Sequence, residues 1–495
     1  MRALFLMVMA FMVQLNLNAQ LSKVHYVPPV AYSDIGNAIP DEGHYFYIST
    51  PSTASVTVNI IAVGVATTTI EVSNSIPHVF TIDPPGPPHS SQIAIGASHD
   101  VAINTSIVDN DKGYIIEATA AVYVALRIAQ EDQAGALVSK GGAALGTDFR
   151  IGAFTSYKPT SNYSSFLSVM ATENTTSIII NDIKKEVDIL DFDEAAHGDD
   201  NVKLNDITFV LDRGESYTIV TRSDQGVDIA DLSSFHNNQK TNSDGLIGAY
   251  VSSDKPIVVN SGSMNGSFGT GGGRDYGFDQ LADLSKVGTE YIFVKGTGED
   301  SWENVLLVAH TDATTITING IPATTAEVHG KATNIKGSHP EVANLSIDAG
   351  SYYLIEGDMY NQVGNMYVQS SAPVFAFQGI GARPGGGGEA NQGLFFVPPL
   401  KCSSTGDVDN IPYINNIGDL DLNSSLNIIS TRGASITISD LNNIDRPILA
   451  LNIAVGTGSF NVSGTADYVT YKISDLAGNV KIVSNGELYC AYYNE

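Results

Sequence analysis

The sequence predicts an all-β protein of about four tandem antiparallel repeats, each β-sandwich-like with six to seven strands. Two observations carry this prediction. Helical periodicity is almost absent from the 495 residues, and 47 glycines and 19 prolines separate short apolar runs. Two strand-rich phrases also recur at long intervals along the chain. The alternative arrangement of the same hairpins is a closed β-propeller-like ring.

The first 19 residues are typical of a secretory signal peptide. Arg2 precedes an apolar run from Ala3 to Val13, and small residues around Ala19 form a cleavage site. The run is too short to cross a bilayer, and no later segment reaches 18 apolar residues. We therefore expect a secreted or cell-surface protein that has no membrane span.

The first recurring phrase is an apolar run, a short polar turn and a second apolar run. Its strongest copy is Leu246 to Ser263, in which Ser252 to Lys255 supply the turn and Pro256 opens the second run. Apolar runs on both sides of a polar turn predict a β-hairpin. We expect further hairpins at Gly113 to Ile128, at Gly364 to Ile380 and, at the end of the chain, at Gly478 to Tyr493.

The second phrase is an apolar strand and a polar turn, followed by threonine or serine at the head of an alternating strand. Four copies align in one register, at Ile70, Ile178, Ile316 and Ile436. They are 108, 138 and 120 residues apart, which is the length of a β domain. We therefore predict repeats at residues 20–160, 161–290 and 291–412, and a truncated fourth repeat at 413–495.

The overall charge excludes one class of partner. Acidic residues outnumber basic ones by 53 to 25, which gives a net charge of −28 at pH 7. A phosphate backbone requires a positive protein surface, so we expect no nucleic-acid partner. The acidity favours either solubility outside a cell or scattered calcium sites.

Two glycine-rich segments are the candidate binding loops, because each follows a predicted hairpin at an equivalent place. They run from Met264 to Tyr276 and from Gly381 to Glu389, and each contains one arginine. The candidate binding residues are Asn265, Arg274, Asp275, Arg383 and Glu389. A glutamine accompanies each hairpin, at Gln133, Gln280 and Gln392. We expect these amides to tie the chain to backbone groups, with ligand contact as the alternative.

Closely spaced aspartates are candidate calcium ligands, since calcium prefers carboxylate oxygens. They are Asp191 and Asp193 in an insertion, and Asp407 and Asp409 near the last repeat. None matches the twelve-residue calcium loop, and a solvated acidic edge is the alternative interpretation. We expect no cofactor other than calcium. Cys402 and Cys490 are the only cysteines, and they form either one disulfide or two free thiols.

Catalytic motifs are missing, so we expect a protein that is not an enzyme. The ten histidines form no HExxH motif, and the chain has no GxSxG motif. A carbohydrate-active enzyme is the remaining catalytic alternative. It requires two carboxylates that face each other across a cleft, about 5 to 10 Å apart.

The hairpin at Ser252 to Ser263 and the segment that follows it resemble a known family. A lysine–proline turn precedes a strand, then an Asp-Gln-Leu phrase and a Gly-x-Glu-Tyr phrase. The matching residues are Lys255, Pro256, Asp279, Gln280, Leu281, Gly288, Glu290 and Tyr291, with Pro373, Gln392 and Pro398 to Leu400 further on. The pattern is similar to the N-terminal domain of IgG Fc-binding protein, a domain also found in exported surface proteins of Bacteroidota. The similarity covers residues 148–400 well and the flanks poorly.

This resemblance implies an adhesin-like surface or extracellular-matrix protein that binds protein or glycan through loops on a repeated β scaffold. It also implies further domains downstream, or other surface components, as partners. The alternative is a structural stalk that presents a C-terminal domain absent from this chain.

Overall fold

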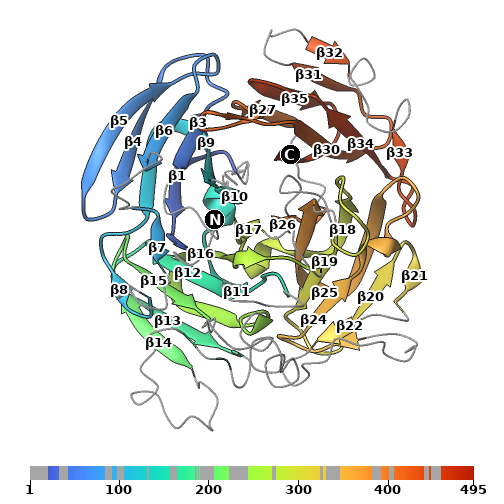
Figure 1. Ribbon diagram of the computed structural model, residues 1–495, viewed down its shortest axis with the longest axis horizontal. Coiled ribbons are helices and arrows are strands. Elements are labelled where there is room, and N and C mark those ends of the chain that lie inside the picture. Colours follow the sequence, from blue (N-terminus) through green and yellow to red (C-terminus); the bar gives the residue numbers. More distant parts are fainter. Residues whose placement is uncertain are drawn as a thin grey trace, which may run out of the picture.

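The computed structural model is all-β, which confirms the predicted class. The structure describes residues 20–32, 43–83, 92–96, 105–130, 133–155, 164–183, 187, 189, 206–221, 244–269, 275–323, 327–329, 346–381, 392–400, 406–439, 445–447 and 459–494. The predicted signal peptide lies outside these residues. Four groups of strands, called the first to fourth units below, lie around a common centre (Figure 1).

The first unit is a seven-stranded sheet in the order β5-β4-β9-β3-β6, and β1 and β10 also pair with β9. Its strands are β1 Ser22–Val27, β3 His44–Ser49, β4 Val56–Ala62, β5 Ala66–Val72, β6 His78–Asp83, β9 Tyr114–Gln130 and β10 Gln133–Val138. A short parallel pair, β2 Val30–Tyr32 and β7 Ala94–Gly96, lies where this unit meets the second.

The second unit repeats this pattern in the order β14-β13-β16-β12-β15-β8, and β11 and β17 also pair with β16. Its strands are β8 Val108–Asp109, β11 Gly146–Arg150, β12 Ser165–Ala171, β13 Thr176–Asn181, β14 Ile207–Leu211, β15 Ser216–Val220, β16 Tyr250–Gly266 and β17 Asp275–Gln280. The first strand of this group along the chain, β8, precedes β9 of the first unit, so the two units are interleaved.

The third unit has the order β21-β20-β25-β19-β24-β22, and β18 and β26 also pair with β25, while β23 pairs with β20. Its strands are β18 Gly288–Val294, β19 Val305–Ala309, β20 Thr314–Ile318, β21 Ile321–Pro322, β22 Glu327–His329, β23 Ser346–Ile347, β24 Tyr352–Ile355, β25 Asn365–Gly381 and β26 Gln392–Val397.

The fourth unit consists of two separate four-stranded sheets, β27-β35-β31-β32 and β33-β34-β30-β36. Its strands are β27 Asp407–Ile411, β30 Ser424–Thr431, β31 Ile436–Ser439, β32 Asp445–Pro447, β33 Phe460–Asn461, β34 Tyr468–Ser474, β35 Val480–Ser484 and β36 Leu488–Asn494. A small hairpin, β28 Asn416–Ile417 and β29 Leu420–Asp421, follows β27.

All four predicted hairpins are wrong. Three of them are each one continuous strand of 17 residues, β9, β16 and β25, and the fourth consists of β35 and β36, which lie in different sheets. The polar residues mark a place where the strand changes partners rather than a turn. Before it, Ser253 pairs with Ile178 of β13, and after it, Ile257 pairs with Ala171 of β12. On the other side, the β11 register jumps from Ser252 to Ile257. Only the fourth copy is broken, into β35 and β36.

Each long strand joins two half-sheets that share one core, which explains the sandwich-like character of the units. In the first unit, β4 pairs with the first half of β9 and β3 pairs with the second half. Apolar side chains from all three strands, such as Phe46, Val58 and Leu126, belong to one buried cluster. The same topology in the next two units follows from the same alternation of apolar residues.

The sheets start and end at different residues from the predicted repeats. Strands of the second unit continue from Gly146, ahead of the expected start at 161, because β11 pairs with β16. The third group starts at Gly288 and the fourth at Asp407, each a few residues ahead of the predicted position.

The first unit contacts the fourth unit, in addition to the contacts between units that are neighbours along the chain, so the ring is closed. The row of units that a stalk requires is therefore not the arrangement found.

Candidate functional site

Three strands lie nearest the middle of the ring: β10, β17 and β26, one from each of the first three units (Figure 1). Strand β17 packs against both β10 and β26. Each of the three strands follows the long strand of its unit, so the three connections β9–β10, β16–β17 and β25–β26 are equivalent; we call them the hairpin ends. The candidate site consists of these central strands and the hairpin ends that they carry.

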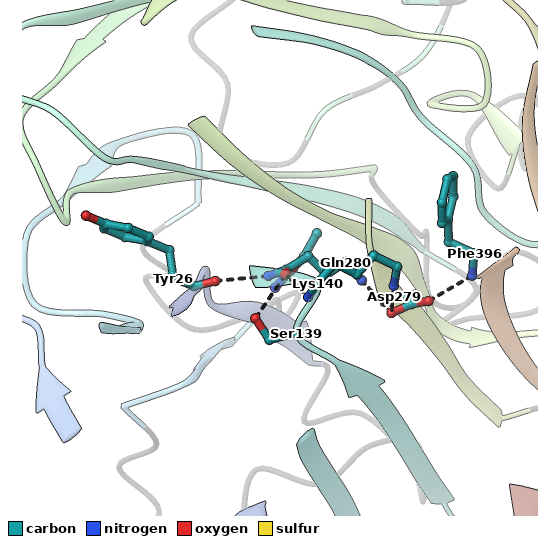
Figure 2. A network of polar contacts seen from close by, with 7 residues as sticks. Tyr26, Ser139, Lys140, Asp279, Gln280 and Phe396 are labelled. Carbon is teal, nitrogen blue, oxygen red and sulfur yellow. Dashed lines mark hydrogen bonds and ion pairs between the residues drawn. The ribbon is translucent and has the colours of Figure 1, made fainter. Parts of the chain in front are cut away.

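A buried ion pair joins the three units at the central strands (Figure 2). The Nζ atom of Lys140 lies 2.8 Å from Oδ1 of Asp279, and both side chains are less than a tenth exposed. The backbone N–H of Phe396 donates to Oδ2 of Asp279 at 2.9 Å. The Lys140 ammonium also lies 5.6 Å from the centre of the Phe396 ring. One residue from each unit therefore meets at this point.

The charges of this pair depend on each other. Burial raises the pKa of Asp279, while the Lys140 ammonium and the N–H groups of Phe396 and Gln280 lower it. Burial lowers the pKa of Lys140, and the Asp279 carboxylate opposes that shift. Removing either partner would leave a buried charge without compensation.

Gln280 bridges the first and second units by backbone contacts, as the sequence predicted (Figure 2). Its Oε1 atom accepts from the N–H of Lys140 at 2.7 Å and from the hydroxyl of Ser139 at 3.1 Å. Its Nε2 atom donates to the carbonyl of Tyr26 at 2.9 Å. The amide is fully buried, and these partners occupy it within the protein.

A serine and a histidine also lie side by side in this network, but they are buried. Nδ1 of His25 lies 3.0 Å from Oγ of Ser139, and Nε2 lies 3.0 Å from the carbonyl of Val122. Burial lowers the pKa of His25 to about 4, so the ring is neutral at pH 7. Neither side chain is exposed, so this pair holds the seam together and is not an accessible nucleophile.

The other two glutamines are not equivalent to Gln280. Gln133 and Gln392 begin their central strands, whereas Gln280 ends β17, so the residue at the matching place in β17 is Asp275. Gln392 accepts from the N–H of Phe268 at 2.7 Å and donates to the carbonyl of Trp302. Oε1 of Gln133 is buried without a hydrogen-bond partner among the described residues.

The structure places two of the five predicted binding residues in strands rather than loops. Asn265 lies in β16 and is buried, and its Oδ1 has no hydrogen-bond partner within the described chain. Asp275 opens β17, where its Oδ1 accepts from the N–H of Ala134 at 2.7 Å and from that of Tyr276 at 2.8 Å. Strand pairing therefore extends further than the glycine content suggests, and the binding role of these two residues stays a prediction. Arg274, Arg383 and Glu389 lie outside the described residues.

Glu303 is an anchor that the sequence did not reveal. Its carboxylate is fully buried and accepts from the N–H groups of Gly381 at 2.8 Å, Gly298 at 2.6 Å and Gly296 at 2.5 Å. Burial raises the pKa of Glu303, and these three N–H donors oppose the shift. It thereby fixes the end of β25. The neighbouring Trp302 ring packs on Gly269, where a side chain would collide with it.

The predicted calcium ligands and the disulfide are only partly described. Asp407 is exposed at the start of β27, Asp409 lies in the same strand, and Asp191 and Asp193 lie outside the described residues. No group of three or more His, Cys, Asp or Glu side chains able to hold a metal occurs in the described part of the chain. Cys490 has no disulfide partner within the described residues, and burial raises the pKa of its thiol. Cys402 lies outside the described residues, so its pairing stays a prediction.

Neither the curated proteins nor the solved structure described below gives a relative from which the fold or the function of this chain can be argued. A search of curated proteins finds no match. A solved Ca²⁺-stabilized adhesin, which helps an Antarctic bacterium to reach out and bind ice, is 9% identical. That alignment covers 95% of this chain and 98% of the adhesin, but its TM-score of 0.11 carries no structural argument. Within the described residues, no helix is long and apolar enough to cross a membrane.

A family model, described as IgGFc binding protein, matches residues 134–493. This match begins at the central strand β10 and runs through β36, so it includes the fourth unit, which the motif resemblance covered poorly. The first unit, apart from β10, precedes it. The matched segment contains β17, β26 and nearly all of β10, together with the Lys140–Asp279 ion pair and the buried residues Asp275, Glu303 and Gln392. The chain belongs to the IgGFc binding protein family.

Proposed function

We propose that this protein is an exported, non-enzymatic surface or matrix protein that binds protein or glycan through the loops at the hairpin ends. The observation that carries the proposal is that equivalent hairpin ends gather at the central strands. The N–H of Ala134, beside the first hairpin end, is bonded to Asp275 at the second. Phe268, in the second, is bonded to Gln392 at the third. These bonds hold the residues that flank the loops on a rigid base, which supports a binding role for the loops.

The scaffold beneath the loops supports binding better than catalysis. Gln280, Glu303 and the Lys140–Asp279 pair are buried, and their polar atoms are occupied by backbone groups or by each other. Such groups position the chain and are not available to a substrate. The family name records antibody binding by other members, which favours a protein or glycoprotein as the ligand here.

The loop arginines give the proposal a specific prediction. Arg274 and Arg383 lie within the connections of the second and third hairpin ends, in a chain with a net charge of −28. Two cations in an acidic protein would select carboxylate-bearing partners, such as acidic glycans or acidic protein surfaces.

The test is binding of the purified chain to glycan and extracellular-protein arrays, followed by affinity measurement for each hit. We expect Arg274→Ala with Arg383→Ala to weaken binding at least about tenfold, the loss of one charge-assisted contact. Lys23→Ala is the matched control, because Lys23 is an exposed cation on β1, outside the hairpin ends. Equal loss in the control, or none in the double variant, would refute the loop assignment.

A further inference from the structure

The turn that leads from β8 into β9 carries two aspartates at the seam of the first two units. Its sequence is Asp109-Asn110-Asp111-Lys112-Gly113. The N–H of Asp111 donates to Oδ1 of Asp109 at 3.1 Å, so the turn folds back on its first carboxylate. Asp109 is 5% exposed, and its Oδ2 has no hydrogen-bond partner among the described residues.

A second orphaned oxygen lies on the strand that pairs with this turn. Ser216 of β15 is the direct ladder partner of Asp109 and is fully buried, and its Oγ also lacks a hydrogen-bond partner in the part of the chain that the structure describes. Side chains of directly paired residues project from the same face of a sheet, about 5 Å apart. Buried hydroxyl and carboxylate oxygens are rarely left unsatisfied, because each costs about 1 to 3 kcal/mol. Two such oxygens on directly paired residues are available as ligands to one bound ion.

The electrostatics define the charge of that ligand. Burial, which is the largest cause, and the nearby Asp111 carboxyl together raise the pKa of Asp109 to about 6, while the Asp111 N–H and Lys112 oppose the shift. Two carboxylates held this close repel each other unless a proton or a cation lies between them. An anion is therefore excluded, and a hard cation with oxygen ligands fits both orphaned atoms.

The turn is held in place from both sides, as an ion site requires. From the second unit, the N–H of Ser106 donates to the carbonyl of Thr218 at 2.8 Å, and the Tyr217 hydroxyl donates to the Ser106 carbonyl at 2.8 Å. From the first unit, the Gln92 amide donates to the carbonyls of Val63 and Asp111. The site would not need to form on binding, which reduces the entropic cost of binding the ion.

We infer that Asp109, Asp111 and Ser216 form a calcium site that fastens the second unit to the first. These residues supply two carboxylates and one hydroxyl, and calcium takes its remaining ligands from water and carbonyl oxygens. The site differs from the pairs Asp191–Asp193 and Asp407–Asp409 that the sequence suggested. Its role is mechanical, because β8 belongs to the second sheet while the chain that follows enters β9 of the first.

The experiment uses the full chain, stripped with EDTA and exchanged into buffer free of chelator. Calorimetric titration with CaCl₂ should show a site with a Kd of about 10⁻⁴ to 10⁻³ M, as for extracellular calcium modules. Millimolar Ca²⁺ should raise the melting temperature more than the same concentration of Mg²⁺, which demands stricter octahedral geometry. Absence of both effects would overturn the proposal and leave a shared proton or a buried water at the pair.

Variants separate this site from other acidic surfaces of the chain. Asp109→Asn should weaken this calcium affinity at least about tenfold, because it removes one of the two charged ligands. Asp206→Asn is the matched control, since Asp206 is exposed and next to β14. Ser216→Ala keeps both carboxylates and should weaken binding by a smaller factor, which protects the test against misfolding of Asp109→Asn. Unchanged affinity in both site variants would overturn the assignment.

Discussion

Two of the interfaces between units, called seams below, each bury a cation, and they compensate the charge of that cation in different ways. At the centre, Lys140 faces the carboxylate of Asp279 at 2.8 Å. Where the first unit meets the fourth, Arg127 of β9 is 1% exposed and donates to backbone carbonyls of Pro412, Tyr413 and Asn416 at 2.6 to 2.9 Å.

The aromatic surroundings complete the Arg127 seam. Its guanidinium lies 4.0 Å from the ring centre of Tyr47 and 5.2 Å from that of Tyr492, and its Nε donates to the Tyr492 hydroxyl at 3.2 Å. No carboxylate bonds to this guanidinium in the described part of the chain. The charge is dispersed over carbonyl dipoles and π faces instead.

The difference shows two ways to close a ring of sheets. The ion pair needs two specific side chains, and loss of either one leaves an isolated charge. The arginine cage needs one side chain and a turn of the right shape, which Tyr413 helps to form with a positive φ of 46°. The central seam should therefore be sensitive to its charges and to protonation, whereas the closing seam should be sensitive to geometry.

The largest expected effect comes from breaking the ion pair on one side. Asp279→Ala leaves the Lys140 ammonium buried and unpaired and removes the acceptor of the Phe396 N–H. We expect a loss of about 3 to 5 kcal/mol in the free energy of unfolding, measured by urea denaturation. The control is Lys140→Met with Asp279→Leu, which removes both charges and should recover most of that loss. If Asp279→Ala lost no more free energy of unfolding than the double variant, the unpaired charge would not be the cause of the loss.

At the closing seam, Arg127→Met keeps much of the side-chain volume but removes every donor. Because no counter-charge is left behind, we expect a smaller loss, about 3 kcal/mol or less. The fourth unit should separate first, which would appear as early proteolytic cleavage near residues 401–405. Arg127→Lys should fail to restore the seam, because an ammonium cannot reproduce the planar fork. Full rescue by lysine would show that charge, rather than geometry, closes the ring.

Acid should act on the central seam and not on the closing one. The folded-state pKa of His25 is about 4, below its ordinary value of 6.5, so its stabilising contribution is complete above pH 6.5. It is lost as pH falls from 6.5 towards 4, by about 2 to 3 kcal/mol at pH 4.5. His25→Gln should remove this part of the pH dependence of unfolding, while Arg127→Met should leave it intact. Identical pH profiles for wild type and His25→Gln would contradict the assignment.

The sequence predicted the all-β class and many of the strands, but neither their order in the sheets nor the contacts between units. Alternating apolar residues set the strands, because burial of one face requires that period. The predicted register holds for Ile178 and Ile316, which lie on strands next to the long strand, but not for Ile70, which lies on the edge strand β5.

The residues Ser252 to Lys255 have the composition of a hairpin turn, but they lie inside β16 where that strand changes partners. A polar kink in a strand and a turn cannot be told apart by composition. Asp279 and Gln280 were noted as a phrase, yet their partner Lys140 lies about 140 residues earlier. The carbonyls around Arg127 carry no sequence signal at all.

The smallest expected effect concerns a third cation, at the surface of the seam between the first two units. Arg213 pairs with Glu117 at 2.7 Å, but both side chains are about two-fifths exposed, so water already solvates them. Arg213→Met should cost no more than about 1 kcal/mol, and high salt should reduce even that difference. Urea denaturation of wild type and variant at low and high ionic strength would measure it. A loss as large as that of Asp279→Ala would mean that burial does not separate the strong seam contacts from the weak ones.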